Sequence, residues 1–379
     1  MTRKIASELR ILELSDIHLG HNNTPTASIL KGLYKLLRET PANTEIDLMV
    51  LAGDVFDREL TFPNDDLVLI RKWIHDLLCF CKKHDIVLRV LEGTPSHDWK
   101  QSFEFAHLNE QSAIGADVKY VKTLCIERIE KLDIDVLYVP DEWRTDNNQT
   151  WIEVQELLVY KGLTQVDFAF MHGAFAHQMP EEASKWMQFH SAENYLSIVK
   201  HHIFIGHIHQ YSQFDRILSA GSFDRLSHGD ESPKGSIRYV LRSDGSYDIR
   251  FIVNKEATIY KTLDLRTCPI AEALDKVVEL VGDDLAHGWH FRLWIERSEG
   301  LSHLLTSLKK LYPQHTWTTK VAALQGQKTE YGFAIIQKAP MTALTPETLP
   351  IAVLERLNAE YPEQSDICMD LLKKLINPS

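Results

Sequence analysis

Five short polar clusters in this sequence combine aspartate and histidine in a way that suits metal chemistry. The clusters are Asp16-Ile17-His18, Gly53-Asp54-Val55-Phe56-Asp57, Ser96-His97-Asp98, His172-Gly173 and Gly206-His207-Ile208-His209. Carboxylates and imidazoles together suit borderline divalent ions such as Mn²⁺, Fe²⁺ or Zn²⁺. One ion takes about three or four protein ligands, and these clusters offer more. The residues therefore predict two ions about 3.5–4 Å apart that share a carboxylate.

Spacing within the clusters indicates which side chains reach one ion. Residues two apart in an extended segment point to the same side, so Asp16 and His18 can bind together. The same holds in part for His207 and His209, although a loop there would send them to different ions. Asp54 follows a strand that we expect to be central in its sheet. We therefore predict that its carboxylate bridges the two ions.

Each cluster directly follows an apolar run of the length of a strand. Strands are predicted at residues 11–16, 46–54, 86–93, 136–139, 166–171 and 203–205, and helices at 29–37 and 67–80. Strands that alternate with helices indicate a layered α/β fold. Ligands of such folds bind beyond the carboxyl ends of the strands, so the five clusters should meet at one edge.

The pattern changes after the last cluster. From about residue 211 to 253, short runs separated by Gly, Ser and Asp indicate antiparallel strands that close a sheet. The order strand, helix, strand, helix, strand over residues 259–321 predicts a small α+β unit. Two amphipathic helices are predicted within residues 346–376, where they pack on their own domain or dock on a partner. We expect domains at residues 1–256, 257–342 and 343–379.

Composition limits the class of protein. Hydrophobic residues make up 44% and charged residues 25%, as in an ordinary globular protein. No apolar run approaches the roughly 20 residues of a membrane-spanning helix. The N-terminus lacks the apolar core of a signal peptide, so we expect a cytoplasmic protein without a membrane contact. The formal net charge of -12 argues against a large nucleic-acid surface, but it permits a small site where metal ions or a basic partner supply positive charge.

The clusters resemble, in order, the motifs of the calcineurin-like metallophosphoesterases. This chain shows DIH, GDVFD, a variant third motif, FMHG and GHIH. Within that superfamily it is most similar to the SbcD-type DNA-repair nucleases, including phage-encoded ones, through SDIHLG, GDVFD and GSFDRL followed by KGSIRYV. The resemblance covers residues 11 to about 253. It implies a layered β-sandwich flanked by helices, a small α+β capping domain that recognises DNA, and C-terminal partner-binding helices.

The resemblance also implies roles for the clustered residues. The first ion would be held by Asp16, His18, Asp54 and His209, and the second by Asp54, His172 and His207. Asp57 and Asp98 would orient the ligand histidines without binding the ions themselves.

The third motif departs from the family pattern. The family supplies an asparagine ligand and a catalytic histidine there, whereas residues 93–98 read GTPSHD and contain no asparagine. Alignment on the histidine gives His97 the catalytic role and Ser96 the ligand position. Thr94 is an alternative ligand. Ser96 could equally be a helix N-cap or turn residue.

By this resemblance the protein is expected to be a DNA nuclease that uses two divalent ions, preferably manganese, with iron, zinc or magnesium as alternatives. It would form a homodimer and act with an SbcC-like ATPase of the SMC family in DNA repair, recombination or replication. The same metal core also serves phosphodiesterases and phosphatases that act on small nucleotides or phosphoproteins. A non-catalytic scaffold subunit is the remaining alternative.

Overall fold

The computed structural model describes residues 8–39, 46–141, 146–180, 188–281, 288–295 and 301–321. They all belong to the first of two compact units, Met1–Ala322, and the second unit is Ala323–Ser379. The helices predicted within residues 346–376, and the end of the predicted unit 257–342, lie outside the described residues.

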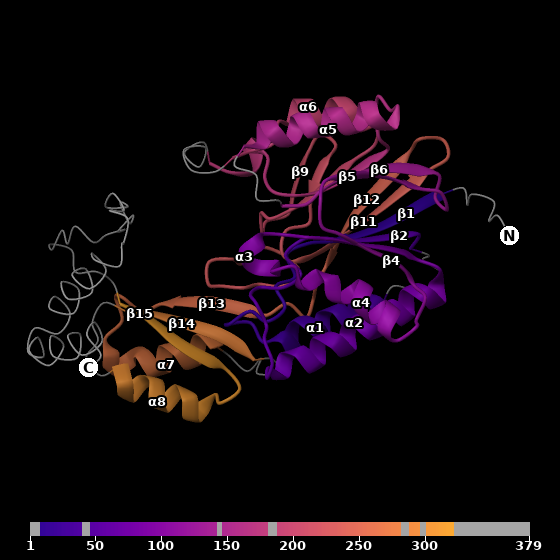
Figure 1. Cartoon of the computed structure of the whole chain (residues 1–379). Helices are drawn as coiled ribbons and strands as arrows, with labels where there is room; N and C mark the ends of the chain where they lie inside the picture. The colour runs from indigo at the N-terminus through magenta and orange to yellow at the C-terminus, as the bar shows by residue number, and fades with distance from the viewer. Residues whose placement is uncertain are drawn as a thin grey trace, which may run out of the picture. The chain divides into compact units, whose positions relative to one another are not determined.

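One six-stranded sheet has the order β12-β11-β1-β2-β3-β4 (Figure 1). Its parallel strands are β1 (Glu8–Leu14), β2 (Leu48–Ala52), β3 (Val87–Leu91) and β4 (Asp117–Val121). Two antiparallel strands extend it beyond β1, namely β11 (Gly235–Arg242) and β12 (Tyr247–Val253). The antiparallel closure that the sequence predicts after the last cluster is confirmed.

A second six-stranded sheet has the order β5-β6-β7-β8-β10-β9. Its parallel strands are β6 (Ile134–Val139), β7 (Phe168–His172), β8 (Ile203–Gly206) and β10 (Ile217–Ser219). Antiparallel strands stand at both edges, namely β5 (Cys125–Ile129) and β9 (Ser212–Phe214). The sheet thus brings β7 and β8, which end in predicted ligands, side by side.

Helices cover the outer face of each sheet. Those on the first sheet are α1 (Thr26–Glu39), α2 (Asp65–His84) and α4 (Glu104–Gln111), and those on the second are α5 (Asn147–Lys161) and α6 (Ala192–Ile198). Alternate strand residues point inward, where Val50 and Val87 of the first sheet meet Phe170 and Phe204 of the second. This arrangement confirms the predicted β-sandwich flanked by helices.

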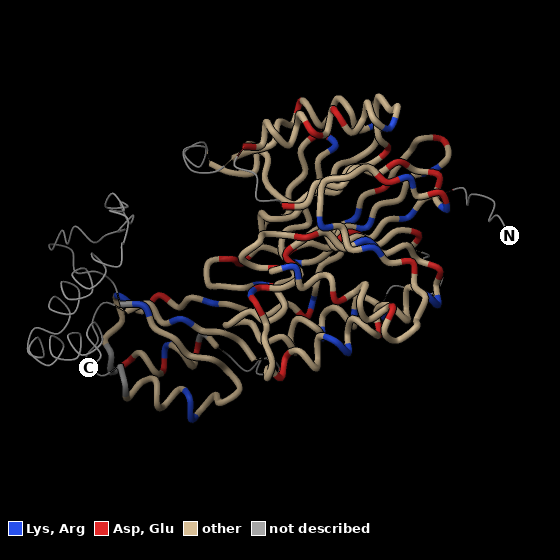
Figure 2. The backbone as a smooth tube through the Cα atoms, viewed as in Figure 1, with Lys and Arg blue, Asp and Glu red and all other residues tan. Residues whose placement is uncertain are grey.

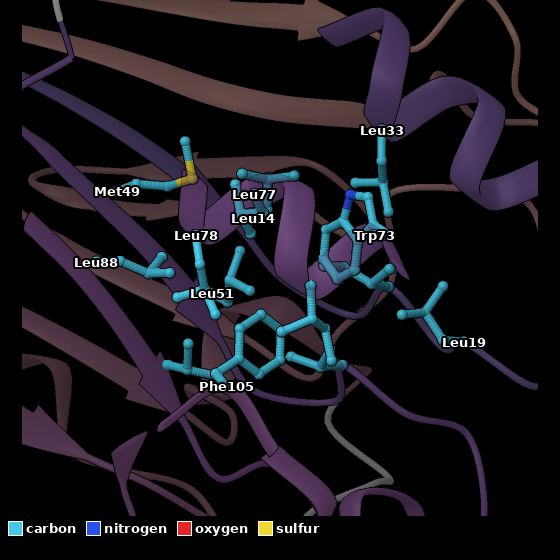
Figure 3. Packing of buried hydrophobic residues seen from close by; sticks show 14 of the residues in the cluster. Leu14, Leu19, Leu33, Met49, Leu51, Trp73, Leu77, Leu78, Leu88 and Phe105 are labelled. Atoms are coloured by element: carbon cyan, nitrogen blue, oxygen red, sulfur yellow. The ribbon is translucent and has the colours of Figure 1, made fainter. Parts of the chain in front are cut away.

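Helix α2 shows how a local sequence pattern determines which helix face packs on the sheet. Asn64 caps its first turn by accepting a hydrogen bond from the amide of Asp66 (2.9 Å). The buried residues recur at helical spacing and are Ile70, Trp73, Ile74, Leu77, Leu78 and Cys81. Figure 3 shows part of this stripe packed with side chains of the strands and α4, including Leu14, Met49, Leu51, Leu88 and Phe105. The packing holds the strands whose ends carry the polar clusters.

A smaller three-stranded sheet follows. Its strands β13 (Ile259–Asp264), β14 (Trp289–Ile295) and β15 (Thr316–Val321) are all parallel. The crossovers contain α7 (Ile270–Val281) and α8 (Leu301–Leu311), which pack on one face of the sheet in a separate core. The predicted alternation of strands and helices over residues 259–321 is confirmed. No helix among the described residues is long and apolar enough to cross a membrane.

Candidate metal centre

The predicted ligands lie at the carboxyl ends of strands from both large sheets. Asp16 and His18 follow β1, and Asp54 follows β2. His172 is the last residue of β7, and His207 comes directly after β8. Because these ends meet at one edge of the sandwich, side chains far apart in the chain become neighbours.

Asp16, His18 and His209 form one group, in which a ligand atom from each lies within 4.8 Å of the others. The Nε2 atoms of His18 and His209 are 3.0 Å apart, and His209 Nε2 is 3.6 Å from Asp16 Oδ1. Both oxygens of Asp16 also accept the backbone amide of His207, at 3.0 and 2.9 Å. That contact holds the carboxylate in position beside the two rings.

Asp54, His172 and His207 form a second group within the same 4.8 Å limit. Asp54 Oδ1 lies 3.3 Å from His172 Nε2, while Asp54 Oδ2 lies 3.8 Å from His18 Nε2 of the first group. The two oxygens of this carboxylate therefore face different groups. This is the geometry required of a bridging ligand.

The charge states of the ligands suit cations. Burial alone would raise the pKa of Asp54, but the charge of His172 and the hydrogen bonds from His172 and His97 outweigh burial and hold that pKa well below its usual range. Burial lowers the pKa of His209 to about 4 and also lowers the pKa of His207. At His172 burial is outweighed by the charge and hydrogen bond of Asp54, which raise its pKa well above the ordinary value, so an ion there would displace a proton. Ionised carboxylates and neutral imidazoles are the forms that bind metal ions. The donor set thus fits a pair of divalent ions.

Backbone conformation marks the same residues. Asp16, His18 and Asp54 have φ values of 51°, 54° and 49°, and His207 has 104°. Such left-handed conformations cost about 1–3 kcal/mol each for residues other than glycine and concentrate at functional sites. Hydrogen bonds between the first two motif loops offset part of that cost, since the amide of His18 donates to the Asp54 carbonyl (3.0 Å). With these backbone conformations the ligand atoms of the side chains converge.

Two contacts orient the ligand rings. His172 Nδ1 lies 2.8 Å from the Ala52 carbonyl, so this nitrogen donates and leaves Nε2 free for an ion. His18 Nδ1 lies 3.1 Å from Asp57 Oδ1, which turns its Nε2 toward the site. These contacts place Asp57 where an orienting carboxylate is predicted.

Asp98 has a different role from the predicted one. It does not contact a ligand ring; its carboxylate accepts the amides of Phe56 (2.8 Å) and Gly93 (2.7 Å). The side chain is fully buried and ties the second motif loop to the third. Spacing along the chain does not show whether a carboxylate faces a ring or the backbone.

The third motif places Thr94 rather than Ser96 among the ligands. Ser96 is exposed, whereas Thr94 Oγ1 lies 3.2 Å from Asp54 Oδ2 and 3.4 Å from both His172 Nε2 and His207 Nδ1. The short helix α3 (Pro95–Asp98) begins directly after Thr94 and carries Ser96 outward. The geometry therefore favours the alternative, Thr94, over Ser96 as the candidate ligand of this motif.

His97 lies at the mouth of the site. Its Nδ1 is 2.8 Å from Asp54 Oδ2, and about a third of the side chain (36%) is exposed. The hydrogen bond with Asp54 raises the pKa of His97 above its ordinary value, although burial opposes that shift. The ring is thus next to the ligands and also open to an incoming substrate.

Sequence reasoning did not assign two further supporting residues. Lys234 is buried, and its Nζ donates to the His209 carbonyl (2.6 Å) while pairing with Asp230. A Cβ at Gly93 would lie 2.0 Å from the Asp54 amide, so only glycine fits there. Lys234 begins the KGSIRYV segment, which was a signal of resemblance but not of this contact. Gly93 gave no local signal because the close approach is made by a distant loop.

Fold and site together define a metal-dependent phosphoesterase. The family model of the calcineurin-like phosphoesterases matches residues 9–211, more than half of the chain. The chain belongs to this family.

Solved structures share only low identity with the chain. One crystal structure is 14% identical with a TM-score of 0.39, and the match covers 65% of this chain and 100% of that one. The protein TT1561 of Thermus thermophilus is 12% identical with a TM-score of 0.38, and the match covers 64% and 98% of the two chains. The comparison with curated proteins gave no significant match.

Proposed function

We propose that this protein is a nuclease that hydrolyses DNA phosphodiester bonds with two divalent ions, preferably manganese. The observation that carries the catalytic part is the convergence of three overlapping Asp and His groups, two of which share Asp54 and one of which includes His97. Family membership supports phosphoester hydrolysis. The choice of DNA rests on the motif resemblance to SbcD-type nucleases.

Asp16, His18, Asp54 and His209 would hold the first ion, and Asp54, His172 and His207, with Thr94, the second. Two bound ions would supply Lewis-acid stabilisation of the phosphoryl oxygens and a water nucleophile near neutral pH. Asp57 and the Ala52 carbonyl keep the ligand imidazoles in the required orientation. Lys234 fixes the loop that carries His209.

His97 would act on the leaving group. Its ring lies beside Asp54 but remains partly exposed, so it can reach an oxygen of a substrate in the site. An imidazole in this position can donate a proton to the departing oxygen. Proton donation of this kind contributes roughly 10²–10⁴ in rate.

The acidic composition supports dependence on a partner. With a net charge of -12, the chain would bind DNA weakly on its own, because phosphate contacts by Lys and Arg supply most of the affinity of DNA-binding proteins. We propose an SbcC-like ATPase as the partner, a homodimer as the assembly and residues 343–379 as the docking segment. The small unit from residue 257 would cap the site and contact DNA.

The test is hydrolysis of linear double-stranded DNA, single-stranded DNA and a small aryl phosphodiester, with and without Mn²⁺. We expect Mn²⁺-dependent cleavage of DNA that Asp54→Ala abolishes. Turnover of the small diester without cleavage of DNA would instead indicate a phosphodiesterase for small substrates. Purified protein without bound metal or turnover would indicate a scaffold.

A further inference from the structure

The small sheet presents a polar face opposite its helices. Phe291, Leu293 and Trp317 point into the core with α7 and α8, so their strand neighbours point the other way. Strand register aligns Tyr260, His290 and Thr316 in one row of that face, and Thr262, Arg292 and Thr318 in the next. Figure 2 shows basic residues on the strands of this sheet.

A pocket of about 420 Å³ opens on this face. Its lining includes His290, Arg292 and Thr318 from the sheet, and Asn22, Asn23 and His228 from two loops of the β-sandwich. The volume lies within the range of about 300–1,000 Å³ that is usual for small-ligand sites. A space of this size can take about one nucleotide unit.

Both loops of the sandwich also touch the metal centre. One carries the predicted ligand His18 and reaches Asn22 four residues later, a span of at most roughly 14 Å for extended chain. The other begins at Ser222, whose amide donates to the His209 carbonyl (3.3 Å), and continues to His228. The loops that line the pocket are therefore continuous with those that carry the centre where phosphodiester hydrolysis is proposed.

Aromatic rings form one wall of the pocket. The rings of Tyr260 and His290 stack with centroids 4.6 Å apart and an interplanar angle of 26°. The Tyr260 hydroxyl is fixed by Thr24 Oγ1 at 2.8 Å, and His228 packs edge-on against Tyr260. A base can stack on a ring that is held in this way, and such stacking tolerates any sequence.

Charge in the pocket comes from Arg292. Burial lowers the pKa of His228 to about 4 and also lowers the pKa of His290, so both rings are neutral near pH 7. A guanidinium beside neutral rings and hydroxyls suits a phosphate next to a base.

We propose that this pocket binds one nucleotide of an unpaired strand of the substrate, with the base against His290 and the phosphate at Arg292. This inference rests on the proposed nuclease function. It assigns the enzyme a preference for polynucleotides with an unpaired segment beside the scissile bond.

Binding of a labelled single-stranded oligonucleotide to the full-length protein, with metal chelated to prevent turnover, tests the pocket. We expect Arg292→Gln to weaken binding about 10-fold and to reduce the salt slope by about one. His290→Ala should weaken binding at least about 5-fold through lost stacking. Lys276→Gln removes a charge from α7 on the opposite side of the small sheet and should leave binding unchanged.

Each outcome has a distinct meaning. If Arg292→Gln and His290→Ala bind like wild type while wild type cleaves oligonucleotides, the pocket proposal is wrong and the nuclease function stands. If the two substitutions weakened binding to single strands and to a blunt duplex equally, the pocket proposal would also be wrong. That result would indicate a general electrostatic surface. Wild type that hydrolyses a small aryl phosphodiester but neither binds nor cleaves oligonucleotides would refute both proposals. If Arg292→Gln fails to fold, Asn23→Ala in the exposed loop tests the pocket instead. We expect Asn23→Ala to weaken oligonucleotide binding, and unchanged binding would overturn the proposal.

Discussion

At the scale of single residues, Asp54 organises the site. One of its oxygens faces His172, and the other faces His18 and His97. The carboxylate therefore lies between the two ligand groups. The residue types and their order in the sequence were enough to place Asp54 among the candidate ligands. The roles of Ser96, Thr94 and Asp98 were not predictable in the same way, because each depends on the direction in which a short loop turns.

His97 is expected to act in turnover rather than in metal binding. His97→Ala should keep bound metal and lose roughly 10²–10⁴ in kcat, since proton donation contributes that much. Metal analysis and turnover of DNA or a small diester measure the two effects. As a control, Asp54→Ala should lose both ions. Loss of metal in His97→Ala as severe as in Asp54→Ala would assign His97 to binding.

The third motif gives a matched pair of substitutions. Thr94→Val keeps the side-chain shape but removes the hydroxyl among Asp54, His172 and His207, so Mn²⁺ affinity at the second site should fall on the order of 10-fold. Ser96→Ala alters an exposed hydroxyl two residues away and should leave both sites intact. Titration of Mn²⁺ into metal-free protein separates the sites. If Ser96→Ala weakened Mn²⁺ binding and Thr94→Val did not, Ser96 would be the ligand.

At the scale of elements, β1 combines structural and chemical roles. Its central position in the sheet follows from pairing with both β2 and β11, and Asp16 lies just beyond its end. The strand also contains Glu13, which is fully buried between the sheets. Burial, and secondarily the charge of Asp16, raise the pKa of Glu13 well above its usual value.

This buried carboxyl should make stability depend on pH. Glu13 keeps its proton in the folded state while the unfolded chain releases it above about pH 4.3, so stability falls as pH rises toward the folded pKa, by up to about 1.4 kcal/mol per unit. Glu13→Gln resembles the protonated acid and should remove that slope. Urea unfolding of metal-free protein between about pH 5 and pH 8 measures it. Parallel pH profiles for the two proteins would show that Glu13 ionises normally.

Several elements were predictable because their patterns are local. The stripe of α2 and the continuous apolar run of β2 repeat with the period of their structures. Strand β4 (Asp117–Val121) and strand β5 (Cys125–Ile129) were missed, since their alternating polar residues and short length give a weak signal. The division of the strands into two sheets was equally hidden, because it is decided by which faces pack together.

At the scale of the whole molecule, the acidic chain is expected to bind DNA weakly by itself and more tightly with a partner. Deletion of residues 346–379 should abolish binding to the proposed SMC-family ATPase partner and leave metal content and small-diester turnover unchanged. Co-purification with the ATPase, together with metal analysis, measures both. Intact complex formation after the deletion would place the docking surface elsewhere in the chain.

The sequence by itself determined the ligand types, their order and the strands that carry them, because strand periodicity and the motifs are local properties. Only the tertiary structure decided which oxygen or nitrogen faces which neighbour, that Thr94 rather than Ser96 lies beside the candidate ligands, and that Asp98 binds backbone amides. It also brought Arg292 and His290 beside loops that start at the metal centre. Such contacts join residues tens to hundreds of positions apart, and their geometry depends on how sheets and loops pack, which no local pattern encodes.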